Sequence, residues 1–125
     1  MRLALMAAGA ALLVPAAASA QSMNAESFLQ RANKLKAKGP LALFSRGEIK
    51  VLMNEGQASG KAASARNKAD KVGGRPTRFC PPTGPQSMNS DEYMTRLAAI
   101  PRAVRQRIDM TEATTRIMAA KFPCR

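Results

Sequence analysis

The 125-residue sequence contains no histidine and no tryptophan, and it has only one tyrosine and four phenylalanines. Without histidine, neither a serine–histidine–aspartate triad nor a cysteine–histidine pair can form. Two cysteines without histidine also argue against a zinc site. The stretch from Gly56 to Lys61 has too few residues between its glycines for a phosphate-binding loop. The sequence therefore predicts no metal, no cofactor and no enzymatic activity.

Acidic residues are few. Twenty lysines and arginines stand against eight aspartates and glutamates, which gives a formal net charge of +12. This sign favours an acidic protein, anionic lipid or nucleic acid as a partner, although it also keeps a small exported protein soluble. The basic residues between positions 57 and 78 have no aromatic side chains among them on which bases could stack. We therefore expect no nucleic-acid partner.

A long apolar run occurs only at the start of the chain. A positive residue precedes the apolar residues 3–14, and small residues follow at positions 18–20. This order predicts a secretory signal peptide over residues 1–20, cleaved between Ala20 and Gln21. An uncleaved anchor is the alternative, but the run is shorter than the ~20 residues that span a bilayer. We expect export across the inner membrane to the periplasm, with no transmembrane segment in the mature protein.

The two cysteines both fall in the expected mature domain, residues 21–125. An oxidising compartment favours a disulfide, and two cysteines allow one intramolecular pairing, Cys80 with Cys124. Two free buried thiols are the alternative. They are disfavoured because Cys124 lies one residue from the end of the chain, where no other feature of the sequence holds it down. Closing a loop of about 45 residues stabilises a small domain by about 4 kcal/mol.

Apolar residues recur at helical spacing along this domain, and no segment alternates as a β-strand does. We predict an all-α fold, a small single-domain bundle of four to five helices. In the first half, one helix is capped by Asn24 and stops at Gly39. A second begins with a capping box at Ser45 and Glu48, and Gly56 weakens or ends it.

The second half predicts a helix capped by Asn89, a short turn after Pro101, and a last helix from Asp109 that stops at Phe122. The aromatic side chains all have the spacing of core or staple positions. They are Phe28, Phe44, Phe79, Tyr93 and Phe122.

Residues 57–78 separate the two halves as a basic, alanine-rich linker or a solvated helix. Arginine and lysine suit contacts with carboxylates, so two basic clusters form the candidate partner-binding surface. The first cluster is Lys61, Arg66, Lys68, Lys71 and Arg75. The second is Arg102, Arg105 and Arg107.

The second half also carries short motifs in a recognisable order. Phe79 and Cys80 precede two prolines, an amphipathic helix follows, Arg105 lies four residues after Pro101, and the chain closes on Phe-Pro-Cys at 122–124. This order resembles the Rap/Tai immunity-protein family, over less than half of the mature chain. That family is all-helical, and its characterised members are periplasmic proteins that bind amidase effectors of type VI secretion systems and block cleavage of cell-wall peptides.

The resemblance implies an exported, non-catalytic binding protein that inhibits a cell-wall amidase effector. Its basic surface predicts an acidic protein partner, such as a secreted effector-type enzyme. The sequence leaves open whether the protein forms a homo-oligomer. The alternative function is a basic, envelope-associated structural protein held by charge to anionic lipid or polymer.

Overall fold

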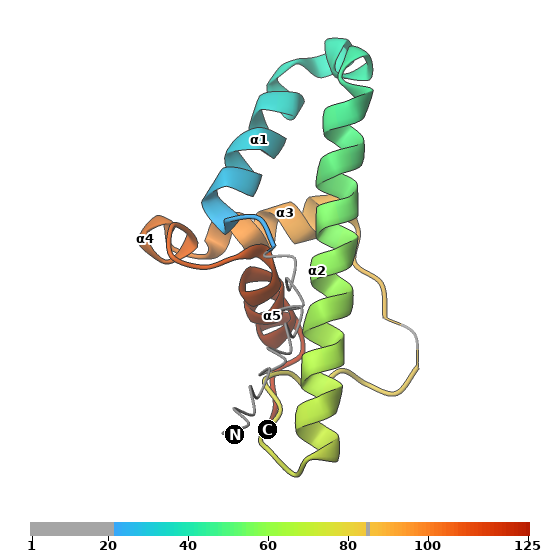
Figure 1. Cartoon of the computed structure of the whole chain (residues 1–125), viewed down its shortest axis with the longest axis vertical. Coiled ribbons are helices and arrows are strands. Elements are labelled where there is room, and N and C mark those ends of the chain that lie inside the picture. Colours follow the sequence, from blue (N-terminus) through green and yellow to red (C-terminus); the bar gives the residue numbers. More distant parts are fainter. Residues whose placement is uncertain (1–21, 85) are drawn as a thin grey trace, which may run out of the picture.

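The order of helices follows the expected pattern, and one long helix includes most of the segment predicted as a linker or a solvated helix. The computed structural model describes residues 22–84 and 86–125. Helix α1 (Ala25–Ala37) leads through the 3-10 helix η1 (Gly39–Phe44) into α2 (Arg46–Val72), and a loop precedes α3 (Ser90–Ala99), α4 (Arg102–Arg105) and α5 (Met110–Lys121) (Figure 1). No strand occurs in these two ranges, so the all-α prediction is confirmed. The predicted signal peptide and its cleavage site, Ala20 and Gln21, lie outside the described residues.

Three helices begin at the caps that the sequence predicts. The caps are Asn24 of α1, Asn89 of α3 and Asp109 of α5. Each side-chain oxygen accepts a hydrogen bond from the backbone N–H three residues on, at 3.1, 2.8 and 2.8 Å. Helix α1 stops before Gly39, whose φ of 54° is in the left-handed region that glycine adopts without steric strain.

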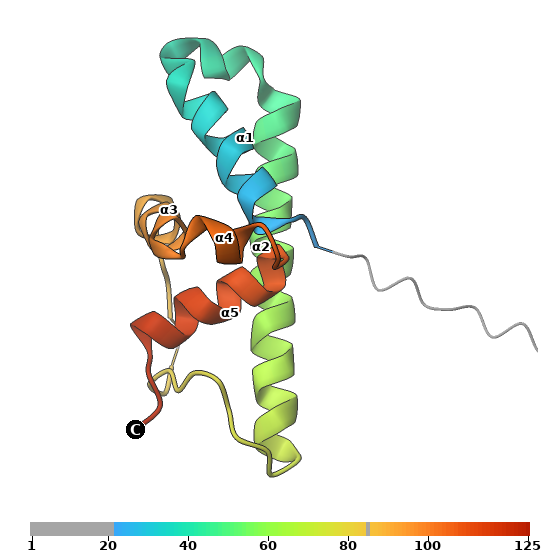
Figure 2. The same ribbon diagram turned by 90° about the vertical axis from the view of Figure 1, so that its left-hand side faces the viewer.

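Helix α2 is where the structure differs most from the prediction. It does not end at Gly56 but continues to Val72, so of the two alternatives for residues 57–78, a linker or a solvated helix, the helix is found as far as Val72. Glycine weakens a helix by about 1 kcal/mol relative to alanine, which a single amphipathic contact surface can offset. That surface includes the buried residues Leu52, Ser59 and Ala63, and α2 packs most extensively against α5. Figures 1 and 2 show α2 running the length of the molecule.

The predicted capping box at the start of α2 is wrong. Ser45 makes no capping hydrogen bond with its side chain, and its hydroxyl instead accepts one from Lys38 Nζ at 2.9 Å. The carboxylate of Glu48 instead accepts two hydrogen bonds from the guanidinium of Arg31 in α1, at 2.6 and 2.7 Å. A bidentate, charge-assisted pair with another helix is stronger than the local contact that the box offers.

The core lies where α1, α3 and α5 meet the middle of α2. Its buried members are Ala25, Phe28, Leu29, Leu52, Leu97, Met110, Ala113 and Ile117. The ring of Tyr93 packs edge-on against Phe28, with centroids 6.5 Å apart, and Phe79 is buried as predicted. Phe44 is 88% exposed, so its assignment to a core or staple position is wrong.

The C-terminal disulfide is present as predicted. Cys80 and Cys124 are bonded, with an S–S distance of 2.00 Å. The Cys80 N–H also donates to the Phe122 carbonyl at 2.8 Å. The bond therefore ties the loop after α2 to the end of α5.

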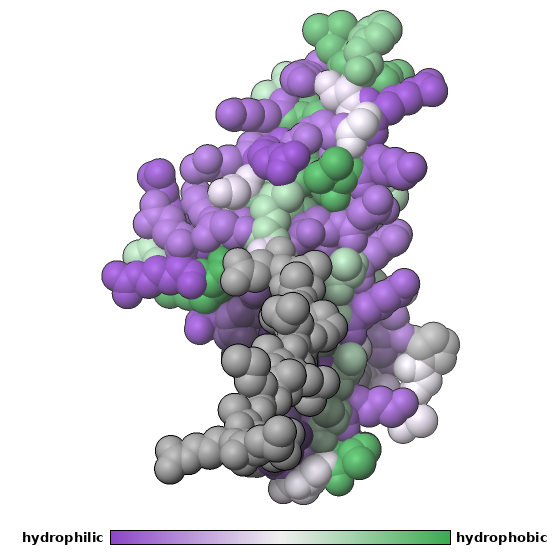
Figure 3. Space-filling view, viewed as in Figure 1, coloured by the Kyte–Doolittle hydropathy of each residue, from purple (hydrophilic) through white to green (hydrophobic). Residues whose placement is uncertain are grey.

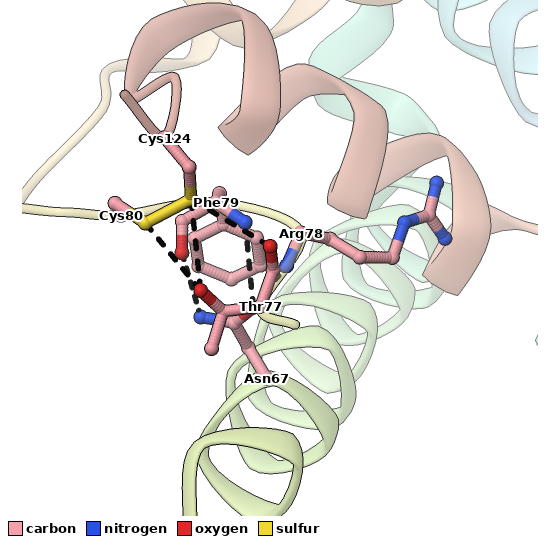
Figure 4. The surroundings of a disulfide bond; sticks show 6 residues. All are labelled: Asn67, Thr77, Arg78, Phe79, Cys80 and Cys124. Carbon is pink, nitrogen blue, oxygen red and sulfur yellow. Dashed lines mark hydrogen bonds between the residues drawn. A yellow bond between two sulfur atoms is a disulfide. The ribbon is translucent and has the colours of Figure 1, made fainter. Parts of the chain in front are cut away.

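Asn67 of α2 holds the same loop from the other side (Figure 4). Its Oδ1 accepts a hydrogen bond from the Arg78 N–H at 3.0 Å, and its Nδ2 donates to the Phe79 carbonyl at 2.9 Å. The second half of α2, the loop and the C-terminus thus meet at one corner of the molecule.

Four glutamates join helices or loops to one another, and they predict how stability depends on pH. The pKa of each is lowered, first of all by a hydrogen bond from a cation: Glu26 from Arg105, Glu48 from Arg31, Glu92 from Lys121 and Glu112 from Arg78. A lowered folded-state pKa stabilises the fold above the unfolded-state pKa of about 4.3, and this contribution disappears as the pH falls through the folded-state values.

We therefore expect the thermal midpoint to fall progressively below about pH 4.3. With no histidine in the chain, it should change little between about pH 5 and 8. Circular dichroism melts across this range measure both effects. A main loss of stability between about pH 6 and 7 would contradict the assignment of these four carboxylates.

Candidate functional site

Five cations lie along one exposed face of α2: Arg46, Lys50, Lys61, Lys68 and Lys71. Lys50, Lys61 and Lys68 are separated by 11 and 7 residues, close to whole numbers of turns at about 3.6 residues each. Arg46 lies one turn before Lys50, and Lys71 one turn after Lys68. None of the five forms an ion pair with another described residue. We call these residues the cationic face; hydrophilic side chains project along α2 in Figure 3.

The carboxylates of α2 lie on the opposite side of the helix. Glu48 and Asp70 pair with arginines, at 2.6 and 2.9 Å, and Glu55 accepts a hydrogen bond from the Met23 N–H at 2.5 Å. No acidic residue of α2 therefore neutralises the cationic face. On a helix of 27 residues, about 40 Å long, these charges attract an anion over the whole length of the molecule.

An apolar groove of about 490 Å³ lies beside the cationic face, between α1, α2 and α3. Its walls include Phe28, Leu35, Ile49, Met53, Tyr93 and Met94. Burial raises the pKa of Tyr93, whose hydroxyl shares a hydrogen bond with Thr114 at 2.7 Å, so this wall of the groove stays uncharged.

The groove and the cationic face share an edge. Met53 and Gln57 line the groove, and along the same row of α2 Lys50 comes one turn before Met53 and Lys61 one turn after Gln57. Met53 is 59% exposed. Methionine is flexible and polarisable, so it packs against surfaces of different shape.

Arg105 of the second predicted cluster is not at the surface. It is buried, and its Nε donates to Glu26 of α1 at 2.6 Å. Its Nη1 donates to the Ala98 carbonyl at 3.0 Å and to the Ile100 carbonyl. These carbonyls belong to the end of α3, where the helix leaves acceptors free. The prediction that Arg105 binds a partner is wrong, because it links α4 to α1 and caps α3.

The remaining predicted cations lie on different surfaces of the molecule. Arg102 lies 3.6 Å from the same Glu26 carboxylate, and Arg107 is exposed. Arg66 is exposed on the side of α2 opposite the cationic face, and Arg75 pairs with Asp70. Helix α4 lies on the side of the molecule away from α2 (Figures 1 and 2), so the two predicted clusters do not form one surface.

Lys61, Lys68 and Lys71 are thus the predicted cations that the structure brings together. Sequence reasoning missed Arg46 and Lys50 because Gly56 is expected to weaken or end their helix, which makes the residues beyond it a separate segment of the prediction. The helical period itself was the available signal, since it runs unbroken from Arg46 to Lys71. The apolar groove was missed because side chains from three separate helices form it.

Over residues 22–84 and 86–125, no group of three or more histidine, cysteine, aspartate or glutamate side chains is placed to hold a metal ion. None of the helices in these ranges has both the length and the apolar character that crossing a bilayer requires. Comparisons with known proteins identify no relative: no family model matches the chain, and no curated protein or solved structure is significantly similar to it.

Proposed function

We propose that this protein is an exported, non-catalytic binding protein that inhibits an acidic secreted enzyme, in the way of the Rap/Tai immunity proteins that it resembles. The observation that supports the proposal most is the position of the cationic face directly beside the apolar groove. Protein interfaces commonly combine a desolvated apolar centre with a charged rim. An acidic partner with an apolar segment matches both parts.

The electrostatics of the cationic face support a role in association. Its lysines are exposed and have no carboxylate partner within α2, so they are free to attract an acidic surface. Such rim charges raise the association rate more than they slow dissociation. Because the charges are at the surface, added salt weakens the attraction.

The rest of the proposal comes from sequence. The apolar leader over residues 1–20 supports export to the periplasm. The absence of histidine supports inhibition rather than catalysis, because the commonest general base is missing. The disulfide-closed second half supports the family resemblance, since Cys80 and the terminal Phe-Pro-Cys carry its motifs.

Binding to a partner tests this proposal. We expect the mature protein to retain an acidic protein from its own cell envelope at low salt and to release it at moderate salt. The triple variant Lys50→Gln/Lys61→Gln/Lys68→Gln should lower the affinity roughly tenfold, mainly through a slower association rate. Biosensor kinetics measure this effect.

The matched control removes the same charge elsewhere, with Arg66→Gln/Arg107→Gln/Arg125→Gln, all at exposed positions away from the cationic face. Its affinity should stay within about twofold of the wild type, since distant rim charges contribute little. An equal loss in both triple variants would show an effect of net charge alone. Failure to retain any protein partner at low salt would contradict the proposal directly.

A further inference from the structure

The end of the molecule where α1 turns into α2 exposes large apolar side chains. Leu41 is 64% exposed, Leu43 68% and Phe44 88%, all within η1. Hydrophobic surface gathers at this end of the molecule (Figure 3), far along α2 from the disulfide corner. We call these three residues the apolar tip.

The apolar tip contributes nothing to the core. No residue of η1 is buried, and the core cluster draws on α1, α2, α3 and α5 instead. A single exposed leucine is ordinary, but a contiguous group of large apolar side chains at a protruding end marks an interaction surface.

Cations surround the apolar tip on both sides. Lys34, Lys36 and Lys38 end α1 or follow it directly, and Arg46 and Lys50 begin α2; all five are exposed. The only acidic residue between positions 34 and 50 is Glu48, and Arg31 already pairs with it. The amine of Lys38 donates a hydrogen bond to the hydroxyl of Ser45, which is neutral. The surroundings of the apolar tip are therefore positively charged without compensation.

We propose that the apolar tip inserts Leu41, Leu43 and Phe44 into the interfacial layer of an anionic phospholipid bilayer, while the surrounding cations contact the headgroups. Lysine and arginine suit this place, because their aliphatic stems lie along apolar surface while the charged ends reach the headgroups. The tip protrudes at the turn between two helices (Figures 1 and 2), and a fluid bilayer accepts a convex surface without a matching pocket.

This membrane contact goes beyond the proposed partner binding and does not depend on it. Arg46 and Lys50 belong to the cationic face as well, whereas Lys61, Lys68 and Lys71 lie further along α2 and stay available to a protein. Each cation near an anionic surface strengthens binding about fivefold, and this part is lost in salt. Burial of Phe44 and Leu43 adds about tenfold or more for each side chain.

Vesicle binding by the mature protein tests the insertion. We expect sedimentation with vesicles of phosphatidylcholine and phosphatidylglycerol at low salt, and little sedimentation with phosphatidylcholine alone. The variant Leu43→Ser/Phe44→Ser should weaken binding about a hundredfold or more, because the contributions of the two side chains multiply. Val51→Ser/Val72→Ser is the matched control, since both valines are exposed on α2 outside the apolar tip, and it should bind within about twofold of the wild type. Circular dichroism checks that each variant is folded.

A fluorescent residue reports insertion directly. The chain has no tryptophan, so Phe44→Trp introduces a single indole. Its emission should shift to shorter wavelength on anionic vesicles and be quenched by brominated acyl chains. Vesicle binding without a shift or quenching would mean contact through charge alone and would overturn the proposal. Equal loss of binding in the tip and control variants would overturn it too. So would a tip-dependent dimer that ignores vesicles, because the tip would then bind a second copy.

Discussion

Replacing both cysteines, as Cys80→Ser/Cys124→Ser, should lower the free energy of unfolding by about 4 kcal/mol. The bond joins residues 44 positions apart, and its loss frees a long loop in the unfolded chain, which raises the entropy of that state. For a domain of this size, the expected fall in thermal midpoint is about 15 to 30 °C. Urea unfolding gives the free energy, and calorimetry gives the midpoint.

Below its lowered thermal midpoint, this variant should keep its folded shape through local contacts. The Cys80 N–H still donates to the Phe122 carbonyl, and Asn67 still holds the loop. The matched control is the wild-type protein in reductant, which should lose the same free energy without any substitution. A loss of less than about 1 kcal/mol in both samples would contradict the assigned role of the disulfide.

Leu97→Ala should cost about 3 kcal/mol of folding free energy. Leu97 of α3 is fully buried in the core cluster, so truncation leaves a cavity as well as removing apolar contact. Helix α3 has only ten residues and packs on α1 and α5, so neighbouring side chains have few ways to close the space. Urea unfolding measures the change.

Val72→Ala is the control for this substitution. Val72 is 83% exposed at the end of α2, so a change at this position should stay within about 0.5 kcal/mol. Similar losses in the two variants would mean that α3 is not held through Leu97. That outcome would contradict the packing described for the core.

The disulfide and the motifs beside it lie apart from the surfaces proposed for binding. Cys80 and the terminal Phe-Pro-Cys lie at the corner where the loop meets α5. The cationic face and the apolar tip lie along α2 and at its opposite end. The double cysteine variant should therefore lose stability first, and below its lowered midpoint it should keep its affinity for partner and vesicles.

Local signals in the sequence determined much of the architecture. Asn24, Asn89 and Asp109 cap their helices because a short polar side chain next to a free backbone N–H needs no distant partner. Helix α1 ends before Gly39 and helix α4 begins after Pro101 for equally local reasons. The all-α class followed from periodicity, and the disulfide pairing from having two cysteines in all.

Tertiary contacts decided the rest, because the residues that pack against a long side chain or a weak helix position determine its conformation. Gly56 stays helical because one face of α2 is held by neighbouring helices, and Glu48 leaves its own helix for Arg31. Arg105 becomes buried because Glu26 and the free carbonyls at the end of α3 compensate its charge, although they are distant in sequence. Phe44 is exposed because no other element covers the turn that carries it. Sequence alone determined the all-α class, three helix caps and the disulfide closure, whereas packing decided how far α2 runs and which of the cations and apolar side chains face solvent.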